Sequence, residues 1–273
     1  MVASRGQNIE RLSGEILELL GTGRQTAPIS DRDPGFSLDS AYEMVGRIRA
    51  LREARGERPV GRKIGFTNPS VWTGYDISGP IWNYVFDSTV WSVEGTATFD
   101  PKGFAELRIE PEIVLHLSVA PEPGMDETAL VGCIDWIAPG FELVHSVFPG
   151  WRFSAADAAA AFGVHGALFV GRPLVLDGEP GAVAAALADV EVELSSEAGE
   201  ARYGKGANVL GSPLTALRFL VREITAFPAG VPLAAGEIVT TGTLTDAMPV
   251  RGGDVWSARF KGLDLAPLRL RVA

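Results

Sequence analysis

Hydrophobic residues recur at helical spacing in the first 55 residues of the chain. An amphipathic helix is predicted over about residues 7–20, with a buried stripe formed by Ile9, Leu12, Ile16, Leu19 and Leu20. Glycines at 21 and 23 end it, and the segment 21–37, rich in Gly, Pro, Asp and Ser, is predicted to be a loop. A second helix is predicted from about Asp39 to Arg55, with a stripe formed by Ala41, Tyr42, Val45, Ile48 and Leu51.

The hydrophobic pattern changes from Val60 onward. Short apolar or alternating segments broken by Gly, Pro and Asp predict strands at 60–66, 84–93, 106–118, 140–147, 166–172, 189–195, 237–241 and 254–260. Two helices interrupt these strands, one opened by Ser154 and the other by Ser212 and Pro213. No repeat of fixed period and no Pro/Ser-rich linker divides the chain. We therefore predict a helical N-terminal part at 1–59 packed on a β-rich part at 60–273.

One predicted strand has an unusually acidic face. Residues 104–117 read FAELRIEPEIVLHL, and alternation along a strand separates its polar from its apolar side chains. The polar face carries Glu106, Arg108, Glu110 and Glu112. Carboxylates two residues apart on a rigid strand converge on one point, which suits Mg²⁺ or Mn²⁺. The alternative from the pattern alone is a half-buried strand with a solvated acidic face.

Proline at position 111 bears on where this strand lies in its sheet. Pro111 separates the last two glutamates and has no N–H to donate to a neighbouring strand. We therefore expect the strand at a sheet edge or beside a bulge.

Composition and charge narrow the classes of partner. The chain has 273 residues, of which 46% are hydrophobic, so it can bury a large core. Its formal net charge of −10 argues against nucleic acid or an anionic membrane surface as partner. No run of eighteen apolar residues predicts a membrane span, and the N-terminus does not read as a secretory signal. A single cysteine, Cys133, allows no intrachain disulfide, and a reducing cytoplasm is expected.

Two further segments carry candidate chemistry. Lys63 lies in GRKIGFT between Gly61 and Gly65, and these glycines allow a ligand to approach closely. Burial and a nearby cation would depress the pKa of Lys63 and suit it to proton transfer, whereas the alternative is a surface lysine. Glu142 stands alone among hydrophobic residues in GFELV. Because an unpaired buried carboxylate is costly, Glu142 is exposed, paired or bound to a metal.

The remaining polar motifs give weaker signals. The three histidines form no HxH or HxxxH cluster, so a zinc site is weakly supported. His165, next to a glycine, is the histidine expected to be most open to a ligand. A second alternating pair, Glu191 and Glu193, precedes a predicted hairpin turn and is interpreted as part of a solvated strand. GxSxG, GxGxxG and P-loop motifs are absent, which removes the common hydrolase, dinucleotide-binding and NTPase interpretations.

Five segments, taken together and in this order, resemble one known family. They are GRKIGFT (61–67), IEPEIVL (109–115), GFELVHS (140–146), GANVLGSPLTAL (206–217) and GEIVTTGT (236–243). The chain resembles the fumarylacetoacetate hydrolase superfamily and, within it, the 2-keto-4-pentenoate hydratase and 4-oxalocrotonate decarboxylase group. The resemblance covers about residues 60–260. It implies an α+β, β-rich fold of mixed β-roll or sandwich type with a small helical N-terminal part, in a homo-oligomer.

The resemblance also implies a set of site residues. A Mg²⁺ or Mn²⁺ ion would be held by Glu110, Glu112 and Glu142, with Glu106 in an outer position or outside the site. The implied catalytic residues are Lys63, His165 and Asp76, the last matching an aspartate that follows the lysine loop in hydratases. The implied substrate-binding residues are Thr243, Phe162 and Gly65. Thr243 matches a turn threonine that helps to hold the substrate carboxylate.

The implied substrate is a small anionic 2-oxo or 2-hydroxy acid. Water would add to a 2-hydroxy-2,4-dienoate, or its 2-oxo tautomer, to give a 4-hydroxy-2-oxo acid in the catabolism of aromatic compounds. Members of the group usually carry a DNASSG-like segment, whereas residues 161–166 read AFGVHG. Phe162 and His165 are therefore expected to alter the recognised tail or the last step.

Three alternatives stay open at this point. A C–C bond hydrolase of the acylpyruvase type shares the implied fold and metal, but its histidine precedes the acidic strand, and here the first histidine is His116 within that strand. His165 could replace it as the base. A decarboxylase needs the same site without water addition. A silent partner subunit would not need Lys63 or the three glutamates.

Overall fold

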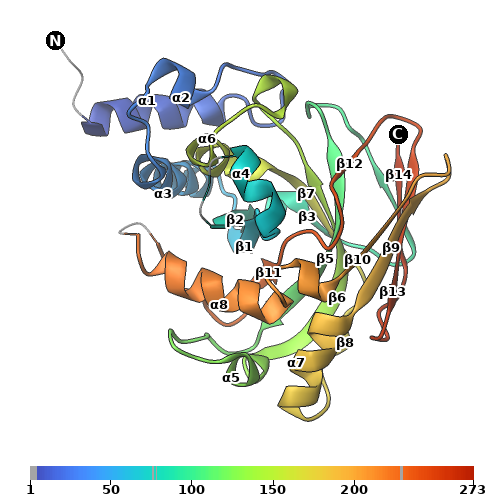
Figure 1. Ribbon diagram of the computed structural model, residues 1–273. Helices are drawn as coiled ribbons and strands as arrows, with labels where there is room; N and C mark the ends of the chain where they lie inside the picture. The colour runs from blue at the N-terminus through green and yellow to red at the C-terminus, as the bar shows by residue number, and fades with distance from the viewer. Residues whose placement is uncertain (1–4, 76, 78, 228–229) are drawn as a thin grey trace.

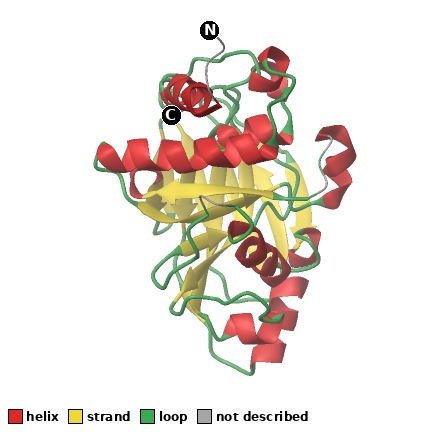
Figure 2. Ribbon diagram, turned by 90° about the vertical axis from the view of Figure 1, so that its left-hand side faces the viewer, coloured by secondary structure: helices red, strands yellow, loops and turns green. Residues whose placement is uncertain are grey.

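The structure is a computed structural model, and it describes residues 5–75, 77, 79–227 and 230–273. The strands form two mixed sheets, and helices lie on both sides of them (Figures 1 and 2). This arrangement confirms the predicted α+β class. No helix of the described residues combines the length and apolarity needed to cross a membrane. Asp76, one of the predicted catalytic residues, lies outside the described residues.

The helices follow the predicted stripes where those stripes are long. The described helices are α1 (Arg5–Leu17), α2 (Ile29–Arg32), α3 (Leu38–Ala54), α4 (Trp72–Tyr75), α5 (Glu127–Val131), α6 (Ala155–Ala160), α7 (Pro180–Asp189) and α8 (Pro213–Ile224). Both predicted N-terminal helices are confirmed as α1 and α3, and the two later ones as α6 and α8. The loop predicted at 21–37 is interrupted by α2. Helices α5 and α7 were not predicted, since α5 is short and the alanine-rich α7 has no distinct apolar stripe.

The larger sheet carries the acidic strand. Its strands run in the order β2 (Ile81–Phe86), β1 (Pro59–Gly65), β11 (Ile238–Thr240), β5 (Arg108–Leu117), β6 (Ile134–Val144), β7 (His165–Val170) and β3 (Val90–Ser92). Two short strands join it, β12 (Met248–Pro249) beside β5 and β8 (Leu174–Val175) beside β6. The strand predicted at 84–93 is divided into β2 and β3, because residues 87–89 form a 3₁₀ turn.

The smaller sheet lies toward the C-terminal half of the chain. Its order is β10 (Ala201–Lys205), β9 (Glu191–Ser196), β13 (Val255–Lys261), β14 (Leu268–Val272) and β4 (Thr96–Phe99). Strands β9 and β10 pair as an antiparallel hairpin, which confirms that interpretation of the second acidic pair. Strands β4, β10 and β14 were not predicted. Gly204, assigned to the turn from the sequence, lies within β10.

Strand β5 lies in the interior of the larger sheet, so the edge position expected from Pro111 is wrong. On one side β5 pairs with β6 along its whole length. On the other side it pairs with β11 at one end and with β12 at the other. Between those two strands, the loop N–H groups of Thr241 and Leu244 donate to the carbonyl oxygens of Ile113 and Pro111. The missing N–H of Pro111 is therefore tolerated where the neighbouring strand is interrupted.

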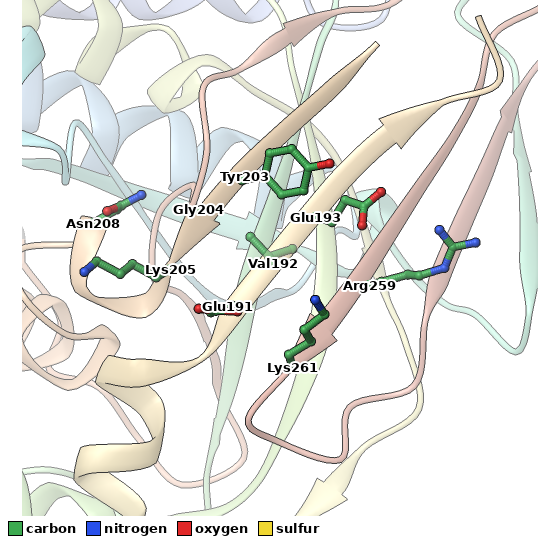
Figure 3. Close-up of a pocket in the computed structure, with 9 residues that line it drawn as sticks. All are labelled: Glu191, Val192, Glu193, Tyr203, Gly204, Lys205, Asn208, Arg259 and Lys261. Atoms are coloured by element: carbon green, nitrogen blue, oxygen red, sulfur yellow. The ribbon is translucent and has the colours of Figure 1, made fainter. Parts of the chain in front are cut away.

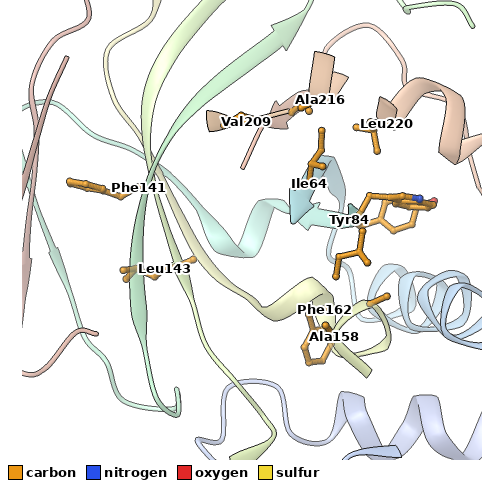
Figure 4. Packing of buried hydrophobic residues seen from close by; sticks show 14 of the residues in the cluster. Ile64, Tyr84, Phe141, Leu143, Ala158, Phe162, Val209, Ala216 and Leu220 are labelled. Atoms are coloured by element: carbon orange, nitrogen blue, oxygen red, sulfur yellow. The ribbon is translucent and has the colours of Figure 1, made fainter. Parts of the chain in front are cut away.

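One hydrophobic core joins the N-terminal helices to both sheets. It includes Ile9 of α1, Val45 of α3, Ile64 of β1 and Leu270 of β14, all of them buried. Figure 4 shows part of this core, where Ile64 and Tyr84 lie near Ala216 and Leu220 of α8.

The glutamate-bearing face of the larger sheet has its own small apolar cluster. Its buried members are Val85, Val114, Ala138, Leu168, Val170 and Ile238. Val114 follows Glu112 on the same face of β5, and Ala138 faces it across β6. One face therefore presents acidic side chains at one end and apolar side chains at the other.

Candidate metal centre and active-site cavity

Three glutamates converge between β5 and β6. Glu110 and Glu142 are direct partners across the two strands, and Glu112 lies two residues further along the same face of β5. One carboxylate oxygen from each lies within 4.8 Å of the other two. Glu112 and Glu142 are fully buried, at 0% exposure. The alternative of a solvated acidic face is therefore wrong, and the predicted alternation is confirmed for Arg108, Glu110 and Glu112.

The carboxylates are held by specific partners. Glu112 Oε2 accepts a hydrogen bond of 2.8 Å from the backbone N–H of Gly242. Glu142 Oε1 lies 2.7 Å from His165 Nδ1, and its Oε2 lies 3.1 Å from Lys63 Nζ. Glu112 Oε1 is buried and has no hydrogen-bond partner. The cluster therefore contains a buried acceptor oxygen without a hydrogen-bond donor.

This donor set fits a hard divalent cation. A buried carboxylate oxygen without a hydrogen-bond donor has lost its contacts with water and has no replacement for them, which destabilises the folded protein. Three carboxylates that meet in a low-dielectric site repel each other, and an ion bound among them would remove both costs. Oxygen-only ligands are those that Mg²⁺ and Mn²⁺ prefer. Glu110, Glu112 and Glu142 can therefore hold such an ion.

Burial and mutual repulsion control the protonation of the cluster. Burial raises the pKa of Glu112 well above its ordinary value, and the neighbouring carboxylates add to this increase. Burial also raises the pKa of Glu110 to about 7, although Lys63 opposes the increase. Burial alone would raise the pKa of Glu142, but Lys63 and His165 outweigh it and lower the value to about 2. Glu142 is thus the permanently ionised member of the three.

Lys63 is buried in the site, with 2% of its side chain exposed. The surface alternative for this lysine is therefore wrong. Burial would lower the pKa of Lys63, but Glu142, Glu110 and Glu112 raise it above its ordinary value. The predicted lowering of the Lys63 pKa is therefore wrong for the protein without a metal ion. The three nearby carboxylates raise this pKa by more than burial lowers it. Lys63 is a protonated ammonium beside Glu142.

His165 lies behind the glutamates and does not face the cavity. It is buried at 3% exposure, so the expectation that it is the histidine most open to a ligand is wrong. Its Nδ1 contacts Glu142, and its Nε2 lies 2.9 Å from Thr89 Oγ1. Burial lowers its pKa, although the Glu142 carboxylate opposes this effect. His165 therefore holds Glu142 in position from the protein interior.

A cavity of about 240 Å³ opens beside the cluster. Lys63, Gly65, Glu110 and Thr243, all singled out from the sequence, line it. Phe162 does not, since it is buried in the core, where Figure 4 shows it beside Ala158 of α6, and Gly163 and Val164 face the cavity instead. The lining also includes residues that were not predicted: Phe66, Thr67, Asn68, Ile81, Arg108, Trp151, Phe153, Gly242, Thr245, Asp246 and Ala247.

Four of the unpredicted lining residues had a usable signal in the sequence. Phe66 and Thr67 lie in the segment GRKIGFT, and Gly242 lies in GEIVTTGT. Arg108 shares the alternating face of Glu110, so its position could have been inferred. Trp151 and Phe153 come from the loop after β6 and carry no local pattern.

The turn after β11 brings Thr243 and Gly242 to the cavity. Thr243 Oγ1 donates to the carbonyl oxygen of Thr245 at 2.9 Å. Gly242 has a φ of 99°, and a Cβ there would come within 2.0 Å of Thr67 Oγ1. Only glycine fits this position, because both the backbone conformation and the contact exclude a side chain.

Glu106 does not reach the cluster. It lies before β5 with a φ of 50°, which ends the alternation. Its carboxylate accepts hydrogen bonds of 2.9 Å from Gln25 Nε2 and from the N–H of Gly150. Glu106 therefore links the loop that contains Gln25 to the loop that contains Gly150.

The second acidic pair lies elsewhere. Glu191 and Glu193 line a groove of about 450 Å³ on the smaller sheet. Figure 3 shows them among Lys205, Arg259 and Lys261, and no third carboxylate is among the described residues that line this groove.

The sequence was compared with known proteins. No protein-family profile matches the chain. The 2-hydroxyhexa-2,4-dienoate hydratase of Comamonas testosteroni is 29% identical over 262 residues, with 94% of this chain and 95% of that protein covered. The 2-keto-4-pentenoate hydratase of Burkholderia vietnamiensis is 30% identical over 270 residues, with 95% and 96% covered. The chain belongs to the 2-keto-4-pentenoate hydratase family.

A solved structure agrees with this hydratase-family assignment. The 4-oxalocrotonate decarboxylase from Pseudomonas putida G7, complexed with magnesium and adipate, matches with a TM-score of 0.87 and 25% identity. The match covers 100% of this chain and 99% of that chain. The resemblance inferred from the five segments is therefore confirmed, and with it the fumarylacetoacetate-hydrolase-like fold. The hydratase-family chain is an enzyme, and its three converging glutamates form a candidate site for a divalent metal ion.

Proposed function

We propose that this chain is a hydratase that uses Mg²⁺ or Mn²⁺ and adds water to a 2-hydroxy-2,4-dienoate to give a 4-hydroxy-2-oxo acid, in the catabolism of aromatic compounds. The observation that carries this proposal is the buried cluster of Glu110, Glu112 and Glu142. It opens onto a cavity that also contains Lys63. The hydratase relatives, which match nearly the whole chain, support the same reaction.

The reaction begins with ketonisation of the dienol. When bound by the three glutamates, the ion would supply Lewis acidity at the substrate's C1 carboxylate and C2 oxygen. Lys63 lies beside Glu142 in the cavity, and we assign its ammonium as the proton donor at the outset. Lys63 gives its proton to C5, and the resulting amine takes the proton of the C2 hydroxyl. The product of this step is a 2-oxo-3-alkenoate, and Lys63 regains its charge.

Hydration follows at the remaining double bond. Water adds across C3 and C4, so that the hydroxyl joins C4 and a proton joins C3. The C2 carbonyl is conjugated with this double bond and accepts the electron pair during the addition. We assign Asp76 as a further catalytic group of this step. Thr243 would hold the C1 carboxylate, and Gly65 would allow the substrate to lie close to β1.

We assign His165 a positioning role. Its contact with Glu142, its burial and its absence from the residues that line the cavity support this role. Residues 161–166 read AFGVHG in place of the DNASSG-like segment of the group. This difference would affect the substrate through Gly163 and Val164, which face the cavity. Phe162 packs in the core and holds their backbone in place. We also propose a homo-oligomer in the cytoplasm, supported by the family resemblance and by the single cysteine.

The decarboxylase is the second candidate, because the fold and the family match include a 4-oxalocrotonate decarboxylase. A Mg²⁺-dependent ultraviolet assay with 2-hydroxypenta-2,4-dienoate, 4-oxalocrotonate and an acylpyruvate separates the possibilities. Loss of conjugation with formation of a 4-hydroxy-2-oxo acid is the expected result. Release of carbon dioxide would identify a decarboxylase, and release of pyruvate with a second acid would identify a hydrolase. Either of these as the main reaction contradicts the proposal.

Stabilisation by Mg²⁺ is expected to increase with pH. In the metal-free protein the pKa of Glu110 rises from 4.5 to about 7. Between these values the folded protein keeps a proton that the unfolded chain has lost, so stability of the metal-free protein falls as the pH rises. Mg²⁺ must displace this proton, and its binding strengthens as the proton leaves. Differential scanning calorimetry with Mg²⁺ or a chelator, from about pH 5 to about pH 8, should show a growing increase in melting temperature. A constant increase would contradict this linkage.

A further inference from the structure

Arg108 and Trp151 face both the active-site cavity and a second groove on the surface. This outer groove has a volume of about 410 Å³, and its lining includes Phe104, Leu107 and Val250. The two residues are stacked, with the Arg108 guanidinium carbon 4.3 Å from the centre of the Trp151 ring. The pair, called the Arg108–Trp151 wall below, therefore separates the two spaces.

The wall is fixed by contacts from separate segments of the chain. The Trp151 indole N–H donates a hydrogen bond of 3.0 Å to the backbone oxygen of Glu106. The Glu106 carboxylate in turn accepts from the N–H of Gly150 and from Gln25, both at 2.9 Å. Arg108 is held within β5 by its pairing with β6 and β12. Because every part is tied to a strand or a loop anchor, the wall closes the cavity as a rigid surface.

The wall lies one step along β5 from the metal-ligating glutamates. Arg108 and Glu110 share a face and are two residues apart, which on a strand is a distance of about 7 Å. Trp151 also contacts Phe153, with ring centres 6.0 Å apart, so two aromatic rings line this part of the cavity. A substrate bound with C1 and C2 at the glutamates would extend its tail toward this surface.

We propose that Trp151, stacked against Arg108, is the specificity-determining residue that sets the length of the substrate tail. Tails that end short of the indole are accepted, and longer tails meet the ring. Removal of the ring joins the cavity to the outer groove and gives a longer tail an apolar path past Phe104 and Leu107. This inference rests on the proposed function only for the orientation of the substrate.

Binding of saturated 2-oxo acids tests the inference without turnover. Isothermal titration calorimetry in Mg²⁺ would compare 2-oxopentanoate, 2-oxohexanoate and 2-oxooctanoate. In the unmodified protein each added methylene should strengthen binding by about fourfold until the tail meets the ring, after which binding should weaken. Trp151→Ala should strengthen 2-oxooctanoate binding by about tenfold or more and change 2-oxopentanoate binding by less than about twofold.

Three further variants serve as controls. Trp151→Phe keeps an aromatic ring at the wall and should keep the original order of affinities. Trp151→Leu replaces Trp151→Ala if the latter lowers the melting temperature. Trp91→Ala removes a tryptophan that is 43% exposed and stacks on Phe169 outside both spaces, so it should change nothing. An equal loss of affinity for all three acids in Trp151→Ala, or no dependence on tail length in the unmodified protein, overturns the inference.

The outcomes also separate this inference from the proposed function. Tail-dependent binding that changes in Trp151→Ala supports the inference even if no dienoate is hydrated, in which case the proposed function alone fails. Hydration of a dienoate by both proteins with the same tail preference leaves the proposed function standing and overturns the inference.

Discussion

Replacing Glu112 by glutamine is expected to weaken Mg²⁺ binding by about 100-fold or more and to remove measurable turnover. Glu112 is fully buried, and one of its oxygens has no hydrogen-bond partner. Glutamine keeps the shape of the side chain but removes its charge. In the presence of a chelator the variant should be at least as stable as the unmodified protein, because one of three repelling buried carboxylates is gone.

Titration calorimetry with Mg²⁺ and Mn²⁺, together with the ultraviolet assay, measures this effect. Glu193→Gln is the matched control, since Glu193 lies in the same ExE pattern but on β9, away from the cluster. It should bind metal and turn over like the unmodified protein. Full metal affinity and full rate in Glu112→Gln would disprove the proposed metal centre.

Replacing Lys63 by methionine is expected to lower kcat by about 10²- to 10⁴-fold, because the variant lacks the ammonium that we propose as the proton donor. Methionine fills a similar volume in a position with 2% exposure, so the strand should stay folded. Mg²⁺ affinity should be unchanged or higher, since the ammonium 3.1 Å from Glu142 repels a cation bound there. Loss of turnover with retained metal binding is thus the expected signature.

The comparison for Lys63 is His165→Asn. If His165 only positions Glu142, this variant should lose metal affinity by about 10- to 100-fold, and excess Mg²⁺ should restore most of kcat. If His165 were the catalytic base, kcat would fall and excess metal would not restore it. A Lys63→Met variant that loses metal binding and turnover together would contradict the separate roles assigned to Lys63 and the glutamates.

The structure explains why the two variants should behave differently. Lys63 reaches the cavity from β1, whereas His165 contacts Glu142 from the side of β7. The same carboxylate thus has a cation on its cavity side and an imidazole on its interior side. Burial and the positive partner act in opposite directions on Glu142, and the partner prevails, which lowers the pKa of Glu142 to about 2.

Local pattern predicted the elements whose signal repeats along one segment. The stripes of α3 and α8 and the alternation of β5 need no knowledge of distant residues, because period 3.6 and period 2 are properties of the backbone. Segments such as α5 and α7 were not predicted, because a short or uniformly apolar segment shows no such period. The division of the chain at residues 59 and 60 stays a prediction, although the N-terminal helices share their core with both sheets.

The sequence by itself predicted the three glutamates and the lysine of the candidate site. The spacing of Glu110 and Glu112 follows from strand geometry, and five ordered segments indicated the family, the third glutamate and Lys63. Only the tertiary structure decided how these groups act on each other. Glu142 lies 32 residues after Glu110 in the sequence, yet the pairing of β5 with β6 makes them neighbours. Such long-range contacts decide the protonation of Lys63, the buried position of His165 and the position of the Arg108–Trp151 wall. The sequence pattern of one segment cannot give them, because the burial and the charges around a side chain come from all the segments packed against it.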